Sequence, residues 1–183
     1  MKTTRNLRPP ATTTVACLLT SMAAIGIISP IDAHNGPATA PERIGVYDSR
    51  AVAIAYAGSK FQEQRMKELK ARYQKAREAG NAGEVSRLEA EGQAWQTTLH
   101  QQGFGTASVE DLLEHVCQEL SKIQKIAGVT CLVSRWNTSE LEKHPQAGQV
   151  DVTMLLVDAF QPSEKQRKAA LEIQNQRPQN LKR

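Results

Sequence analysis

The alternation of apolar and polar residues marks a short strand followed by a long helical segment. Ile44 and Val46 alternate with other residues over positions 43–47, as in a half-buried strand. Residues 50–79 contain no proline and are rich in good helix formers, so they predict one helix of about 30 residues. Apolar residues recur along it at intervals of three and four, the spacing of a coiled-coil seam. They are Met66, Leu69, Tyr73 and Ala76.

A tight turn and a returning helix follow. Gly80 ends the first helix and Asn81 caps the next one. Residues 59–80 contain seven basic and three acidic residues, whereas residues 84–101 contain one basic and three acidic residues. Opposite charges on the two segments favour a long antiparallel coiled-coil hairpin over residues 50–102. The seam of the returning helix consists of Val85, Leu88, Trp95 and Leu99.

Two glycines, Gly103 and Gly105, interrupt the returning helix on either side of Phe104. Ser108 then marks a new helix start, and a wide apolar stripe over residues 109–127 predicts a helix that packs on a body. Phe104 is either a plug at a hinge or a contact for a partner, and the sequence supports both interpretations.

The remainder of the chain predicts a second strand, a closing helix and a tail. β-Branched residues favour a strand over 129–134, and residues 150–157 fit both strand and helix spacing. We expect a helix there, capped by Asp151. Residues 161–183 predict a basic tail that begins as a frayed helix and is then disordered. The two strands form a small body whose apolar positions are Ile44, Val46, Val129, Cys131 and Val133.

The composition favours the same fold class, mainly α with a small β part. Only 4% of the residues are aromatic, and good helix formers are abundant. We therefore expect the hairpin to project from a small body that contains two short strands.

The first residues resemble a secretory signal peptide. Lys2, Arg5 and Arg8 precede an apolar run over residues 15–28, and Ala33 suits signal peptidase. We expect cleavage after residue 33, with residues 34–42 as a flexible leader. The run of about 14 residues is shorter than a membrane span, although an uncleaved anchor remains the alternative. Either form operates outside the cytoplasm.

Charge indicates no nucleic-acid partner. Removal of residues 1–33 takes away three basic residues and one acidic residue, so the formal net charge falls from +4 to +2.

The two remaining cysteines, Cys117 and Cys131, either form a disulfide in an oxidising compartment or act as two small buried apolar residues.

No pattern of catalytic, nucleotide-binding or metal-binding residues is present in the sequence. The four histidines lie in different segments and outside any HExxH pattern, and no GxSxG, Walker or GxGxxG motif occurs. We expect a protein that is not an enzyme, with no catalytic residue, no cofactor and no metal ion.

The order of the elements resembles the Skp/OmpH-like family of periplasmic chaperones. Residues 43–49 are similar to the family's first strand and its turn into a long helix, and residues 127–133 are similar to its second strand. Residues 150–153 look like the opening of its last helix. The resemblance covers residues 43–160, and it rests on short apolar and capping motifs.

The resemblance implies a homotrimer in which strands from three subunits complete a small β body and helical arms surround a cavity. It also implies that unfolded outer-membrane proteins are held there without ATP. We therefore expect a periplasmic holdase chaperone. The alternative is a coiled-coil structural or adaptor protein of the envelope, whose seam or basic tail binds a specific partner or an anionic membrane surface.

Overall fold

The computed structural model describes residues 41–177, which are mainly helical and contain one small sheet. This confirms the predicted fold class at that level. The predicted signal peptide, residues 34–40 of the predicted leader and residues 178–183 of the tail lie outside this range. Between residues 41 and 177, no helix combines the length and the apolar character that crossing a membrane requires.

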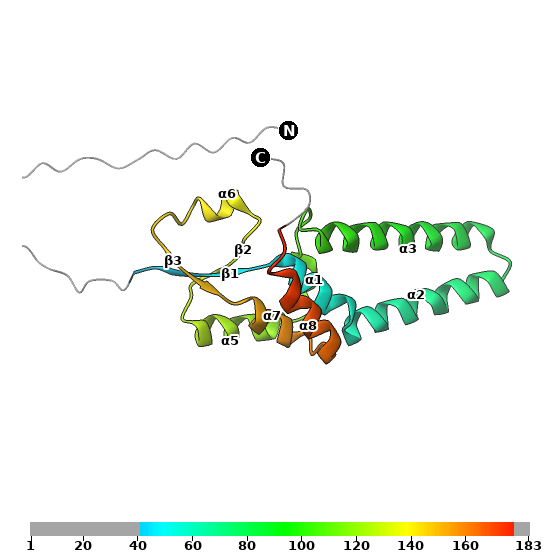
Figure 1. Ribbon diagram of the computed structural model, residues 1–183. Coiled ribbons are helices and arrows are strands. Elements are labelled where there is room, and N and C mark those ends of the chain that lie inside the picture. The colour runs from blue at the N-terminus through cyan, green and yellow to red at the C-terminus, as the bar shows by residue number, and fades with distance from the viewer. Residues whose placement is uncertain (1–40, 178–183) are drawn as a thin grey trace, which may run out of the picture. The chain divides into compact units, whose positions relative to one another are not determined.

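The sheet consists of three parallel strands, with β1 (Arg43–Tyr47) between β2 (Leu132–Ser134) and β3 (Gly148–Asp151), as Figure 1 shows. All three strands belong to the same chain. At the centre of β1, Gly45 leaves room for its neighbours, because a Cβ atom there would lie 2.8 Å from Leu132 Cδ2. The predicted first strand is confirmed.

The other two strands differ from the prediction. β2 begins at Leu132, so Val129 and Cys131 precede it. The expected helix over residues 150–157 is wrong at its start, because Val150 pairs with Gly45 in β3 and the helix α7 begins only at Thr153 (Thr153–Ala159). Strand pairing decides between the two periodicities that this segment fits.

The predicted helix over residues 50–79 is two helices, α1 (Ser49–Ala57) and α2 (Lys60–Glu78). Ser59 caps α2, since its hydroxyl accepts a hydrogen bond from Gln62 N. A side chain at Gly58 would overlap the Gln166 side chain of a later helix. The break thus coincides with a local glycine and capping serine and with the close approach of a segment distant in the sequence.

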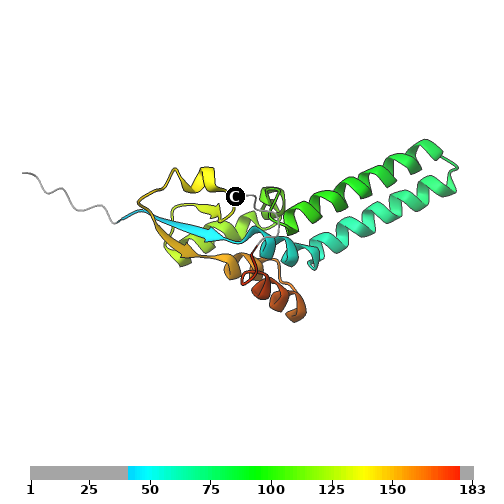
Figure 2. The same ribbon diagram turned by 45° about the horizontal axis from the view of Figure 1, so that its top comes forward.

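α2 and α3 (Ala82–Gly103) are antiparallel and lie side by side (Figures 1 and 2). Gly80 has a φ of +65°, and Asn81 Oδ1 accepts a hydrogen bond of 3.0 Å from Glu84 N. These are the turn and cap that the sequence predicts between residues 79 and 83.

The predicted helix over residues 109–127 is also divided, into α4 (Glu110–Glu114) and α5 (Cys117–Ala127). The break at His115 and Val116 leaves Leu112, Leu113 and Val116 all buried. A single straight helix over these residues is therefore the wrong prediction. After β2 the chain forms one further short helix, α6 (Thr138–Leu141).

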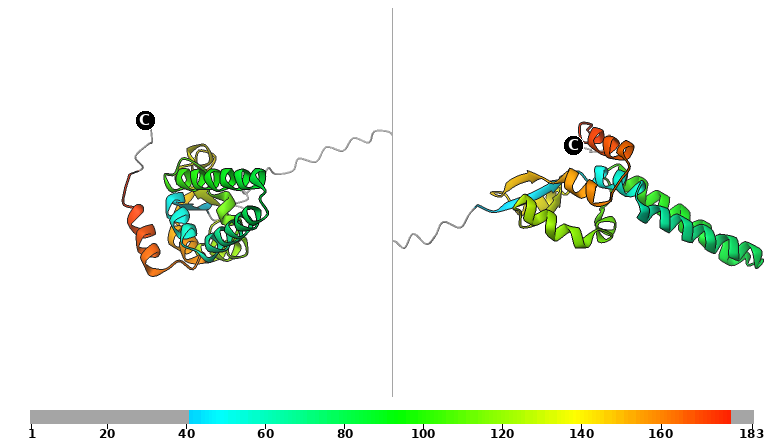
Figure 3. Two further views of the ribbon diagram at one scale, coloured as in Figure 1. Left: turned by 90° about the vertical axis from the view of Figure 1, so that its right-hand side faces the viewer. Right: turned by 90° about the horizontal axis from the view of Figure 1, so that it is seen from below.

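The segment predicted as a basic tail contains a regular helix, α8 (Glu164–Ile173). Ser163 and Gln166 form a capping box at its start, and Ala170 is fully buried. Figure 3 shows α8 beside α1. The tail therefore begins with a helix, as expected, but this helix is capped and packed rather than frayed over residues 164–173.

Two apolar clusters hold these elements together. The smaller one lies at the sheet, where Ile44, Val46 and Val133 pack together. The main core lies among the helices that flank the sheet and at the base of α2 and α3. Its largest fully buried side chains are Tyr56, Phe160, Leu112, Leu156, Val52, Val109, Val152 and Val157.

A buried ion pair joins the end of β1 to the start of α1. Asp48 is 0% exposed and Arg50 is 3% exposed, with Arg50 Nη2 2.7 Å from Asp48 Oδ2. Burial opposes the charged carboxylate, but hydrogen bonds from Arg50 and Trp136 outweigh it and hold the pKa of Asp48 below its ordinary value. Asp48 also caps α1 by accepting a hydrogen bond from Arg50 N.

We predict that Asp48→Ala lowers the free energy of unfolding by about 3–5 kcal/mol, because it leaves the Arg50 guanidinium buried and unpaired. The measurement is the midpoint of urea unfolding. Arg72→Ala is the control, because it breaks an exposed ion pair with Glu91 that contributes at most about 1 kcal/mol. Equal losses for the two variants would contradict the assignment.

Candidate functional site

An apolar groove lies between α2 and α3 and has a volume of about 570 Å³. Met66 is 44% exposed, and Leu69 and Tyr73 are half-buried beside it. Leu88 and Gly92 line the facing side from α3. The groove therefore presents accessible apolar surface within the predicted seam.

Gly92, which falls at a heptad position between Leu88 and Trp95, shapes this groove. A Cβ atom at position 92 would lie 3.4 Å from Leu69 Cδ2, in ordinary contact, so the glycine leaves space rather than avoiding a clash. The available signal is a glycine at a seam position inside a helix, where alanine would favour the helix by about 1 kcal/mol.

The eight predicted seam residues fall into three groups. Met66, Leu69, Tyr73 and Leu88 line the groove. Nearer the turn, Ala76 is buried and Val85 is half-buried. At the other end of the helices, Trp95 and Leu99 pack against the main core.

Charged side chains stand at the margin of the groove. Lys67 and Lys70 line it from α2, together with the acidic residues Glu63 and Glu89. The Tyr73 hydroxyl donates a hydrogen bond of 3.1 Å to Glu89 Oε1 across the two helices. The margin therefore offers partners of both signs to a bound polar group.

An exposed ion network connects the two helices beside the groove. Arg72 donates two hydrogen bonds of 3.1 Å to the Glu91 carboxylate, and Arg87 contacts the same carboxylate at 3.4 Å. The hydrogen bond from Arg72 lowers the pKa of Glu91. The sequence predicts opposite charges on the two segments, and this pair joins them.

Trp95 fixes the base of the α2 and α3 pair. Its Nε1 donates a hydrogen bond of 3.0 Å to Gln62 Oε1, and the Arg65 guanidinium lies 4.0 Å from the centre of its ring. The ring also meets Tyr56 edge to face, with 5.8 Å between the ring centres. These contacts within the fold explain the position of the Trp95 side chain.

A second hollow, of about 510 Å³, lies between Tyr56 of α1, the first half of α2 and His115, which follows α4. Phe61 stacks on His115 with 5.2 Å between the ring centres, and Tyr56 lies 5.3 Å from the same imidazole. The Tyr56 hydroxyl is buried and has no hydrogen-bond partner within residues 41–177, and burial raises its pKa. This hollow is lined by aromatic rings and edged by Lys60 and Arg65.

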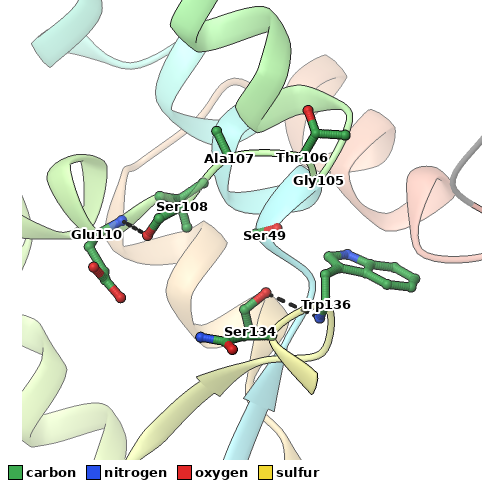
Figure 4. A pocket seen from close by; sticks show the side chains of 10 residues that line it. Ser49, Gly105, Thr106, Ala107, Ser108, Glu110, Ser134 and Trp136 are labelled. Carbon is green, nitrogen blue, oxygen red and sulfur yellow. Dashed lines mark hydrogen bonds between the residues drawn. The ribbon is translucent and has the colours of Figure 1, made fainter. Parts of the chain in front are cut away.

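A smaller polar pocket, of about 220 Å³, lies beyond the carboxyl ends of β1 and β2 (Figure 4). Ser49, Ser108 and Ser134 line it together with Trp136. This edge of a parallel sheet is where ligands commonly bind. Glu110 is the one ionisable group among its lining residues, which include no histidine or cysteine.

The predicted disulfide partners carry free thiols in the structure. Cys117 is exposed at the start of α5, and Cys131 is half-buried before β2.

Phe104 is 54% exposed after α3, and the centre of its ring lies 6.4 Å from that of His100. Residues 41–177 contain no group of three or more histidine, cysteine and acidic side chains suited to hold a metal ion.

Comparison with protein-family models, with curated proteins and with solved structures gives no match for this chain. The sequence and the geometry of the groove are therefore the basis of the function proposed below.

We predict that Gly92→Ala raises the free energy of unfolding by about 0.5–1 kcal/mol, because alanine favours the helix and its methyl group has room beside Leu69. Gly105→Ala is the matched control. Gly105 has a φ of +74°, so the same substitution there should lower stability by about 1–2 kcal/mol. Thermal unfolding of both variants checks the two signs, and a loss of stability in Gly92→Ala would contradict the geometry.

Proposed function

We propose that this chain is an exported, ATP-independent holdase chaperone that binds unfolded envelope or outer-membrane proteins. The observation that carries the proposal is the open apolar groove between α2 and α3. Its volume of about 570 Å³ is within the range of sites that bind small molecules or short peptide segments.

The lining of the groove suits a client without a fixed sequence. Methionine adapts its shape to different partners, and the half-buried Leu69 and Tyr73 add apolar surface at little conformational cost. Charges of both signs at the margin can contact the polar positions of an alternating β-strand sequence. Apolar burial of this kind needs no nucleotide.

The proposed assembly follows from the family resemblance. β1, the long helices α2 and α3, and β2 follow one another in the order expected of the Skp/OmpH-like family, with the shorter helices α1, α4 and α5 between them. In the proposed homotrimer, the α2 and α3 pair of each subunit acts as a projecting arm, and the three grooves face a common client. We place the protein in the periplasm, since the first 33 residues resemble a signal peptide.

The purified chain should suppress aggregation when a denatured outer-membrane β-barrel protein is diluted from urea, as followed by light scattering. Gly92→Leu should weaken this suppression several-fold, because the added side chain occupies the groove beside Leu69. Ala90→Leu, at an exposed position on the same helix and outside the groove, is the matched control and should suppress aggregation as the wild type does.

Two outcomes would argue against the proposal. No suppression by the wild-type chain would exclude a general holdase, and an equal effect of the two leucine variants would exclude the groove as the binding surface. The alternative of an envelope adaptor is favoured by single exposed apolar side chains outside the groove, Phe104 and Leu171. An adaptor would capture one partner selectively and leave β-barrel aggregation unchanged.

We predict a solution mass of three chains by light scattering coupled to gel filtration. Strands from several subunits would then extend the small sheet, as the resemblance implies. A monomer over the same concentration range would contradict the proposed assembly without excluding a client-binding groove, because the groove is formed within one chain.

A further inference from the structure

Three side chains that can act together in thiol chemistry lie at the amino-terminal edge of the sheet. Glu42 immediately precedes β1, Cys131 immediately precedes β2, and His144 lies in the segment that leads into β3. Because the three strands are parallel, their amino-terminal ends meet at the same edge. Residues far apart in the sequence are thereby brought into contact.

The distances form a chain from thiol to carboxylate. Cys131 Sγ lies 3.9 Å from His144 Nε2, and His144 Nδ1 lies 3.0 Å from Glu42 Oε1. An ionised carboxylate can only accept hydrogen bonds, so Nδ1 carries the proton. In the neutral imidazole, Nε2 is then the acceptor, and it faces the thiol.

Backbone hydrogen bonds hold the three residues in this arrangement. The carbonyl of Cys131 accepts a bond of 2.8 Å from Gly45 N, and the carbonyl of Glu42 accepts one of 2.8 Å from Gly148 N. His144 N donates to the Leu141 carbonyl at 3.0 Å. The arrangement is therefore fixed by the sheet and by the turn that follows α6.

All three side chains of this cluster are at least partly exposed. Cys131 is half-buried against the small apolar cluster at the sheet, and the His144 side chain is 21% exposed. Glu42 is on the solvent side, with its side chain 49% exposed. Cys131 is therefore neither fully buried nor fully exposed.

We propose that Cys131 is a reactive thiol that exchanges with low-molecular-weight disulfides, with His144 as its base and Glu42 as the residue that positions the imidazole. A nucleophile within reach of a base, which is itself oriented by a third group, is the arrangement that activates cysteine in other proteins. This inference does not depend on the proposed chaperone function.

The exchange needs no oxidant other than the disulfide itself. His144 Nε2 accepts the thiol proton, and the Cys131 sulfur attacks one sulfur of the disulfide. A bond forms between Cys131 and that sulfur, the original disulfide bond breaks, and the leaving thiolate takes the proton from the imidazolium. Cys131 is oxidised to a mixed disulfide, and the other half of the reagent is reduced to a free thiol.

Cys117 provides an internal comparison, because it is exposed but has no histidine contact within residues 41–177. Two proteins that each retain one thiol separate the sites in the full chain. Cys17→Ser with Cys117→Ser leaves Cys131, and Cys17→Ser with Cys131→Ser leaves Cys117. Dithiodipyridine is the probe, and release of thiopyridone at neutral pH gives the rate.

We expect the protein that retains Cys131 to react about tenfold faster than the one that retains Cys117, although Cys131 is less exposed. His144→Gln should remove this advantage. Glu42→Ala should reduce it, and Glu42→Gln, which can still accept a hydrogen bond from Nδ1, should restore part of the rate. Oxidised glutathione should give the same order of rates.

Folding of each variant is checked by urea unfolding, and the thiol content is checked by complete reaction in urea. If Cys131 reacts no faster than Cys117, the proposal is overturned. A folded His144→Gln variant with an unchanged Cys131 rate would overturn it as well, since the thiol would then be reactive through exposure alone.

Discussion

The ion pair between Asp48 and Arg50 connects more of this protein than any other polar contact described above. It lies where β1 ends and α1 begins, with both side chains buried. Trp136, which follows β2, donates to the Asp48 carboxylate, and Thr153 at the start of α7 accepts a bond of 3.0 Å from Asp48 N. The Arg50 guanidinium reaches the carbonyl of Ile173 at the end of α8. These two residues therefore relate the sheet to three helices. Removing the Asp48 carboxylate would take a partner from Arg50 and Trp136, and removing the Arg50 guanidinium would take one from the Ile173 carbonyl, whereas the bond from Asp48 N to Thr153 belongs to the backbone.

Elements with local signals were predictable from the sequence. Alternating β-branched residues mark β1, and the glycine and asparagine at positions 80 and 81 mark the turn between α2 and α3. The break between α1 and α2 has a local signal as well, Gly58 followed by the capping Ser59, which the expectation of one continuous helix did not use. β3 was missed for a different reason. Its periodicity fits a helix equally well, and only pairing with β1 decides the matter.

The candidate sites were likewise predictable from the sequence only in part. Heptad spacing predicts that Leu69 and Tyr73 face the other helix, and both line the groove. The groove itself depends on the missing side chain of Gly92, which spacing alone does not interpret. The contact between Cys131 and His144 lay beyond sequence reasoning, because it requires three parallel strands and only two strands were expected. The sequence left two alternatives for Cys117 and Cys131, a disulfide in an oxidising compartment or two small buried apolar residues.

The central position of β1 also bears on how the chain folds. Its neighbours come from late in the sequence: Arg43 meets a residue 87 positions away, and Asp48 meets one 105 positions away. Contacts of such long range form slowly, because the entropy of closing a large loop is lost before the pairing contributes stability. The helical middle of the chain can form from local contacts in the meantime. A nascent chain that ends before residue 148 would therefore carry β1 with one edge unpaired, and β1 can acquire both neighbours only after nearly the whole described region has been synthesised.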